Sequence, residues 1–243
     1  MKTLSTFVMA ALLSVAFFSN ADAIMLNATK DAYVYANAAN ANFGSEQVNL
    51  LKRQGSTQHN RKSYIGFDLS GLGPAPITAA TLTLNFVDSN LGTLNSDGLN
   101  TAFEFELFGL MDQTLDGWGE NSITWNNAPA NMSGYSLGAS AVSLGTFSLL
   151  GKGIGTYDFS SLLLADFLNA DTNNLATLIL RRNTDQTSAN VNTYVHAFAS
   201  LESQAGAKLT IEQMHAPIPE PSTVILLGAG LAGLGFMRWR RKS

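Results

Sequence analysis

The chain has 243 residues, with 14 basic and 18 acidic side chains, three histidines and no cysteine. The absence of cysteine excludes disulfides, a thiol nucleophile and thiolate metal sites. Between Ile24 and Ile218 there are nine Lys and Arg against 16 Asp and Glu, so this region carries a net charge near −7, which excludes nucleic acid and disfavours anionic membranes as partners.

The N-terminal residues predict a signal peptide over residues 1–23. Lys2 supplies an early positive charge, and the apolar run 7–18 is too short to span a bilayer. Ala21-Asp22-Ala23 has the small-x-small pattern of a signal peptidase site. We therefore expect the export machinery and signal peptidase to act on this chain, and the mature protein to begin at Ile24.

Residues 24–215 predict one all-β domain. The segments 80–86 and 103–107 alternate apolar and polar side chains with period two, which is typical of antiparallel strands with one face in water. In this interpretation Glu104 and Glu106 point into solvent. Further strands are predicted at 32–36, 47–52, 63–69, 122–125, 142–149, 154–159, 176–182, 192–199 and 207–212. Two facing sheets, a β-sandwich, bury so many short strands economically.

One helix is expected, from Ser160 to Asn169. Ser160 is placed to cap its N-terminus, and Leu163, Leu164 and Phe167 share one face.

Several short blocks follow one another between residues 28 and 212. They are Asp31-Ala-Tyr-Val34, Asn42-Phe-Gly44, Arg61–Ser70, Ile77–Leu82, Trp118–Pro129 and Phe198–Ser203. Together they resemble the DNRLRE or disaggregatase-related domain, a family that overlaps carbohydrate-binding module family 96. The resemblance implies an all-β, antiparallel jelly-roll-like β-sandwich that sits on surfaces or matrices and grips polysaccharide in some members. The six-letter motif that names the family is absent, and 88–100 looks like an insertion.

Two residues of the Trp118–Pro129 block are ligand candidates. Trp118 lies between two glycines, so its flat ring is suited to stack on the C–H face of a sugar. Glu120 either accepts backbone N–H bonds within its loop or helps to bind a cation or a sugar hydroxyl.

The clustered cations are the pairs Lys52-Arg53, Arg61-Lys62 and Arg181-Arg182. If the strands that carry them adjoin, they form a patch for polymers of uronic acids, with Arg61 as the ligand-binding candidate. Neighbouring residues of a strand point to opposite faces, so at most one member of each pair contributes to one face. Scattered, solvated charge is the alternative.

Calcium is the one cofactor that the sequence offers, because oxygen ligands are abundant and no disulfide braces the fold. One candidate site is the insertion, with Asp88, Asn90, Asn95 and Asp97. The other is Asp31, which Glu202 approaches if the two ends of the domain pair. Neither has the EF-hand pattern, and a solvated polar loop is the alternative at the insertion.

Catalysis has little support in the sequence. His59, His196 and His215 stand far from one another, and no Gly-x-Ser-x-Gly elbow is present. We therefore predict that the protein is not an enzyme.

The C-terminal region 216–243 resembles the PEP-CTERM sorting signal of Gram-negative bacteria. Its elements are the motif Pro219, Glu220 and Pro221, an apolar helix over about 222–237, and a basic tail at 238–242 with Arg238, Arg240, Arg241 and Lys242. The resemblance implies that an exosortase-type membrane protease recognises the motif. The helix is then a transient inner-membrane anchor with its basic end in the cytoplasm, and the domain reaches the cell surface or extracellular matrix.

Three hypotheses for function follow. The first is a non-enzymatic surface or matrix protein whose sandwich binds polysaccharide or supports exopolysaccharide and biofilm structure. The second is a purely structural matrix protein without a defined ligand, and the third is a polysaccharide-degrading enzyme.

Overall fold

The computed structural model of the protein describes residues 21–55, 57–91, 100–132, 134–185 and 194–214, together with 228–230, 238 and 240. The chain divides into a compact unit of Asp22–Gln213 and a second unit that comprises the two chain ends. The strands lie in the first unit, apart from one residue at each end.

The described residues of this unit form eleven strands and one α-helix, α1 (Leu162–Asn169). The strands are β1 (Ala21–Asn27), β2 (Lys30–Tyr35), β3 (Val48–Leu51), β4 (Arg61–Asp68), β5 (Ile77–Val87), β6 (Ala102–Leu110), β7 (Ala141–Leu150), β8 (Gly155–Ser160), β9 (Leu175–Arg182), β10 (His196–Ala199) and β11 (Lys208–Met214). Strands β2 to β11 coincide with predicted strands. β1 was not predicted, and it runs across the predicted signal peptidase site.

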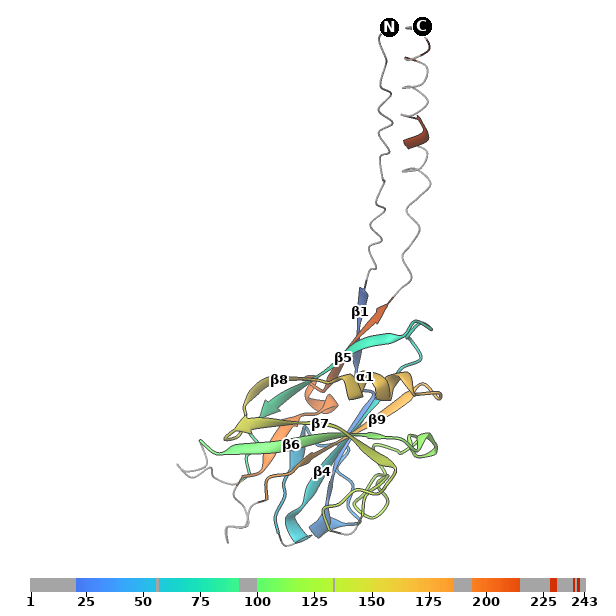
Figure 1. Cartoon of the computed structure of the whole chain (residues 1–243). Coiled ribbons are helices and arrows are strands. Elements are labelled where there is room, and N and C mark those ends of the chain that lie inside the picture. Colours follow the sequence, from blue (N-terminus) through green and yellow to red (C-terminus); the bar gives the residue numbers. More distant parts are fainter. Residues whose placement is uncertain are drawn as a thin grey trace. The chain divides into compact units, whose positions relative to one another are not determined.

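The strands form two antiparallel sheets, which confirms the predicted sandwich (Figure 1). One sheet has the order β1-β11-β5-β10-β3, and β8 pairs with the other edge of the long strand β5. The second sheet has the order β2-β4-β9-β6-β7. Helix α1 follows β8 and packs against β5 and β7.

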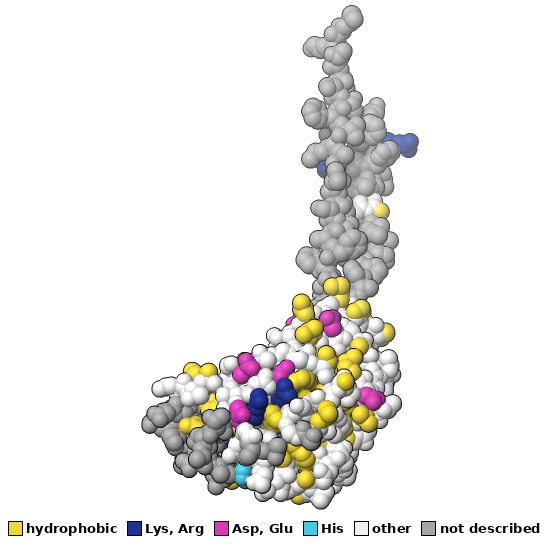
Figure 2. Space-filling view, turned by 60° about the horizontal axis from the view of Figure 1, so that its bottom comes forward, with side chains coloured by type: hydrophobic (Ala, Val, Ile, Leu, Met, Phe, Trp, Pro, Cys, Tyr) yellow, Lys and Arg dark blue, Asp and Glu magenta, His cyan; other side chains and the backbone are white. Residues whose placement is uncertain are grey.

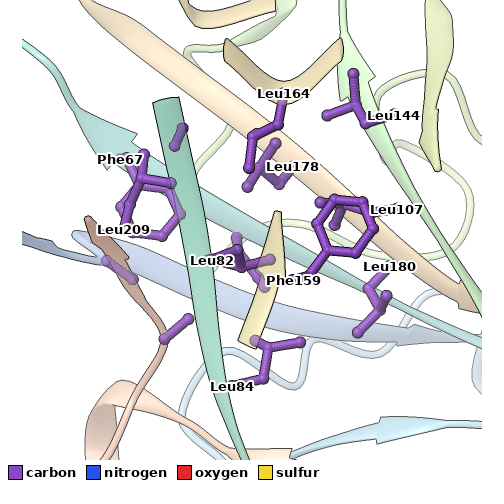
Figure 3. Packing of buried hydrophobic residues seen from close by; sticks show 14 of the residues in the cluster. Phe67, Leu82, Leu84, Leu107, Leu144, Phe159, Leu164, Leu178, Leu180 and Leu209 are labelled. Carbon is purple, nitrogen blue, oxygen red and sulfur yellow. The ribbon is translucent and has the colours of Figure 1, made fainter. Parts of the chain in front are cut away.

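The main core lies between the sheets, and the period-two pattern of the sequence builds it. Leu82 and Leu84 of β5 face Leu178 and Leu180 of β9, and all four are fully buried (Figure 3). Aromatic rings of β6 and β7 complete this layer, since Phe105 stacks on Phe147 with 5.4 Å between ring centroids.

A second apolar layer covers the outer face of the sheet that contains β4. Tyr64 and Ile179 of that sheet pack against Ile123 and Trp125 of the long β6–β7 connection. The predicted strand 122–125 is wrong, because these residues form consecutive turns in which Asn127 Oδ1 accepts from Thr124 N at 2.6 Å. The alternation of buried and exposed side chains comes from the turns and resembles that of a strand.

Two smaller predictions also need correction. Helix α1 begins one residue later than expected, because Ser161 is its cap and accepts from Leu164 N at 3.0 Å. Its buried face therefore includes Leu164 and Leu168, while Leu163 is 54% exposed. Glu104 is exposed as predicted.

Glu106 does not point freely into solvent. It is half-buried and forms an ion pair with Arg181, with Nη2 and Oε2 2.9 Å apart. The cation on the adjacent strand β9 explains the difference.

Replacing Phe105 by Ala should lower the free energy of unfolding by about 3–5 kcal/mol, because the cavity lies between the sheets and cannot collapse fully. Chemical denaturation measures the loss. Ser148→Ala, an exposed position of the neighbouring strand β7, is the matched control and should change stability by less than about 0.5 kcal/mol. Equal losses in the two variants would contradict the assigned faces.

Candidate functional site

The three basic pairs of the sequence meet at one end of the sandwich. Ser63 of β4 pairs with Leu180 of β9, and the same register continued brings Lys62 alongside Arg181 and Arg61 alongside Arg182. A bridge between Lys52 and Arg61 adds the chain that follows β3. We call this group the basic end; its members are Lys52, Arg53, Arg61, Lys62, Arg181 and Arg182.

The basic end holds most of the positive charge of the domain. Six of the nine Lys and Arg between Ile24 and Ile218 belong to it, in a region with net charge near −7. On the face shown in Figure 2, Lys and Arg side chains gather in one patch, with Asp and Glu side chains beside them.

The cations form two layers that differ in exposure. Lys52, Lys62 and Arg182 are fully buried. Arg53 and Arg181 are half-buried and reach the surface. The buried cations contribute positive electrostatic potential to this end of the domain. The half-buried guanidinium groups are the ones that reach solvent.

Aromatic rings pack against both layers. The guanidinium of Arg61 lies 3.9 Å from the ring centroid of Tyr35, whose hydroxyl lies 2.7 Å from His59 Nδ1. Three cations surround the ring of Tyr135 at 5.3–5.9 Å from its centroid, those of Lys62, Arg53 and Arg181. Such contacts stabilise cations that burial would otherwise disfavour.

Backbone carbonyls accept from most of the buried donors. Lys62 Nζ donates to Asn131 Oδ1 and to Ser136 O, both at 2.7 Å. Arg182 Nη2 donates to Arg53 O at 2.8 Å. The cations therefore hold the loops of this end in place, as well as supplying charge.

Two donors of the basic end remain unpaired. The Nε atoms of Arg61 and Arg181 are buried and have no hydrogen-bond partner in the described part of the chain. Two carboxylates offset part of this charge, since Glu106 forms an ion pair with Arg181 and the charge of Asp185 raises the pKa of Arg182. The site has more donors and more positive charge than its described neighbours neutralise.

Burial lowers the pKa values of the lysines at the basic end. Burial first, and the charge of Arg181 second, bring the pKa of Lys62 to about 7. Burial, Arg61 and Arg182 together lower the pKa of Lys52 to about 8. Burial likewise lowers the pKa of His59. An anion close to these groups would raise all three pKa values.

The structure places Trp118 and Glu120 away from the basic end, at the opposite end of the outer-face layer. Trp118 is half-buried, donates from Nε1 to Thr177 Oγ1 at 3.0 Å, and has Lys30 Nζ 4.3 Å from its ring centroid. Glu120 accepts from Asp31 N at 2.7 Å, so its backbone partner lies on β2 and not within its own loop. Both residues hold the long connection onto the sheet, and a ligand role for either stays a prediction.

Asp31 is buried at the same place. Its carboxylate accepts from Asn49 Nδ2 at 2.8 Å and from Leu201 N at 3.0 Å. Burial, with smaller effects from Glu202 and Glu120, raises the pKa of Asp31 to about 6. The two ends of the domain therefore meet, which was the condition for Glu202 to approach Asp31, and the carboxylate links them by hydrogen bonds.

The insertion shows a different arrangement. Asp88 forms an ion pair with Lys152 and accepts from Asn90 N at 3.0 Å, and Asp97 lies in the part of the chain that is not described. Within the described ranges, no group of three or more His, Cys, Asp or Glu side chains has the arrangement of a metal site. Calcium at Asp31 or at the insertion stays a prediction.

Most of the predicted sorting signal is outside the described ranges, including Pro219, Glu220, Pro221, Arg241 and Lys242. Arg238 and Arg240 are exposed helical residues, and 228–230 are helical as well. No described helix has the length and apolarity that a membrane crossing requires. The boundaries 1–23, 24–215 and 216–243 stay predictions.

Comparison with known families gives two matches. Residues 22–143 match carbohydrate-binding module family 96, and residues 217–242 match the PEP-CTERM protein-sorting motif. A search of curated proteins finds no match. The sorting motif implies an exported protein that an exosortase processes at the membrane of a Gram-negative bacterium.

Sequence reasoning found the cations of the basic end but not their aromatic partners Tyr35 and Tyr135. Tyr135 lies in a loop, and its hydroxyl accepts from Arg182 N at 3.0 Å, across 47 residues of sequence. The dibasic pairs were the signal in the sequence for this group of cations. The sequence did not show that β4 pairs with β9, and this pairing brings the cations and Tyr135 together.

The protein should become more stable as the pH rises from 7 to 9. The folded pKa of Lys62, about 7, lies below its ordinary value of 10.5, so the unfolded chain binds more protons in this range. The free energy of unfolding should rise by about 3 kcal/mol, about 2 from Lys62 and about 1 from Lys52, whose folded pKa is about 8, as urea denaturation at constant ionic strength would show. Lys62→Met should remove at least half of the rise. Lys208→Met, at an exposed lysine, should keep it, and a flat profile for the unaltered protein would refute the argument.

Proposed function

The chain belongs to carbohydrate-binding module family 96, and from this membership we propose that its sandwich binds an acidic polysaccharide at the basic end. The observation that carries the proposal is the alignment of two basic pairs by the register of β4 and β9, with the third pair added by the bridge between Lys52 and Arg61, in a domain that is acidic elsewhere. Modules of this family bind without catalysis, which agrees with the prediction that the protein is not an enzyme.

The chemistry of the basic end suits carboxylates on a sugar chain. Arg53 is a half-buried guanidinium group, and a guanidinium can hold a carboxylate with two parallel hydrogen bonds, whereas Arg181 beside it already pairs with Glu106. The buried lysines behind them strengthen the attraction, because charges act over longer range where water is excluded.

The excess of cations gives the ligand a physical reason to bind. Burial lowers the pKa values of Arg61, Arg182 and Lys52. The charges of Arg61 and Arg182 lower the pKa of Lys52 further, because the cations repel one another. An acidic ligand removes part of that repulsion. A neutral ligand of the same shape does not, so the site discriminates by charge.

The sorting motif supports the location of this activity. An exported protein with a PEP-CTERM motif meets its exosortase at the inner membrane. In the proposed function the processed domain then resides at the cell surface or in the extracellular matrix. There it contacts exopolysaccharide and contributes to the cohesion of a biofilm.

Tetragalacturonate should bind the full-length protein in a sugar-free detergent, as measured by isothermal titration calorimetry. Arg53→Gln and Arg61→Gln should each weaken binding by roughly tenfold or more. Arg53→Gln removes a charge-assisted hydrogen bond to the ligand, and Arg61→Gln removes a buried positive charge that attracts it. Raising the NaCl concentration from 50 to 300 mM should weaken binding further.

The matched control is Lys208→Gln, which removes one positive charge on β11 without changing the basic end. It should leave the affinity for tetragalacturonate unchanged. Equal weakening in Lys208→Gln and Arg61→Gln would mean that only net charge matters. Absence of tetragalacturonate binding at 50 mM salt would also reject the proposed site.

Replacing both Pro219 and Pro221 by Ala should block processing in a host with an exosortase, because the sorting motif is then lost. Intact-mass measurement of surface and secreted protein should show that the unaltered chain lacks Arg238–Ser243 and that the variant retains them. Lys208→Gln, outside the matched residues 217–242, is the control and should be processed normally. A surface-located, unaltered protein that still carries Arg238–Ser243 would contradict the sorting role.

A further inference from the structure

A cavity of about 340 Å³ lies at the end of the sandwich opposite the basic end. It forms where the turn 69–77 after β4 meets the chain that leaves α1, and its size falls within the range of small-ligand pockets, about 300–1,000 Å³. β4 runs away from the basic end and β9 runs back toward it, so the strand length separates the two places by roughly 25 Å.

The walls of the cavity are fixed by side chains that bond to backbone. Gln213 Nε2 donates to Gly73 O at 3.0 Å and to Ala75 O at 2.6 Å. The amide of Asn169 bonds to both N and O of Ile77, at 2.9 and 2.8 Å. The turn is therefore held in one conformation before any ligand binds, which lowers the entropic cost of binding.

Polar groups without partners line this cavity. Asp171 uses Oδ2 to accept from Asn174 N at 2.7 Å, and no described hydrogen bond involves its Oδ1 or the side chain of Asn174. The Oε1 of Gln213 is buried at the wall and also has no partner among the described residues. Asp171 is half-buried and Asn174 is exposed, so water can solvate both, whereas a buried acceptor such as Oε1 of Gln213 is normally satisfied by an ordered water or by a ligand hydroxyl.

The charge of the lining selects against an acidic ligand. None of the described residues that line the cavity is Lys or Arg, and Asp171 contributes a carboxylate. Leu72 and Pro74 supply apolar surface beside these acceptors. A ligand that matches this lining carries several hydroxyl donors on an uncharged, partly apolar body.

We infer that this cavity is a second binding site, and that it takes a neutral sugar residue. The hydroxyls of the sugar donate to Asp171 and Asn174, and its C–H face packs against Leu72 and Pro74. The inference goes beyond the proposed function, which concerns acidic polymers at the basic end. The domain then has two binding sites of opposite preference at its two ends.

The test titrates the full-length protein, in a sugar-free detergent, with cellotetraose, maltotetraose and mannotetraose. At least one of these neutral probes should bind. Ala75→Phe places a large side chain in the cavity and should weaken that binding more than about tenfold. Asp171→Asn removes a charged acceptor and should weaken it roughly three- to tenfold. Asn174→Gly removes the amide and tolerates the left-handed backbone at this position, where φ is 62°.

Asp166→Asn is the matched control, since it removes an exposed carboxylate of α1 outside the cavity. It should leave the affinity for the neutral probe unchanged. Tetragalacturonate binding by Ala75→Phe checks that this variant is folded, because the basic end is remote. Failure of all three neutral probes to bind, or binding that Ala75→Phe leaves intact, would overturn the inference. Neutral binding without tetragalacturonate binding would uphold it and reject the proposed function instead, with the melting temperature then serving as the folding check.

Discussion

The antiparallel register of β4 against β9 is the constraint on which both ends of the sandwich depend. Ser63 lies opposite Leu180 and Asp68 opposite Leu175, so the two strands begin and end together. At one end this alignment gathers the basic pairs. At the other it joins the turn after β4 to the turn before β9, where Leu69 N donates to Asn174 O at 2.9 Å. A slip of one residue would turn the core leucines of β9 outward, so burial of the core fixes the geometry of both ends.

The basic end has an energetic cost that the rest of the fold must offset. Fully buried cations such as Lys62 and Arg182 lose hydration, and unpaired they would destabilise a small domain. Aromatic faces and loop carbonyls replace part of the lost water, and the low pKa of Lys62 lets it shed its charge near neutral pH. The remaining deficit is what an anionic ligand can relieve. The same groups therefore weaken the free protein and favour the bound one, which is common where a site is prepared for charge.

The fold was predictable from the sequence to the extent that it depends on local patterns. Alternation in β5 and β6 identified strands whose buried side chains lie between the sheets, and the lack of cysteine correctly directed attention to that core. The same alternation predicted a strand wrongly at Ile123 and Trp125, because turns that pack on a sheet can also bury every second residue. Partners remote in sequence were not predictable. Glu120 was expected to accept a backbone N–H within its own loop, but its partner Asp31 lies 89 residues away on β2, and nothing near Glu120 indicated that partner.

In the two proposals taken together, the rigid separation of the ends adds more to retention on a polymer than the strength of either site does. Sugar sites of this size bind weakly, since each loses translational freedom for few contacts. A domain that holds one acidic and one neutral segment at a fixed distance of roughly 25 Å makes the second contact intramolecular once the first has formed. Retention in a mixed polymer network then exceeds what either end provides alone. In the two proposals taken together, such a domain joins chemically different chains, because its two sites differ in charge preference.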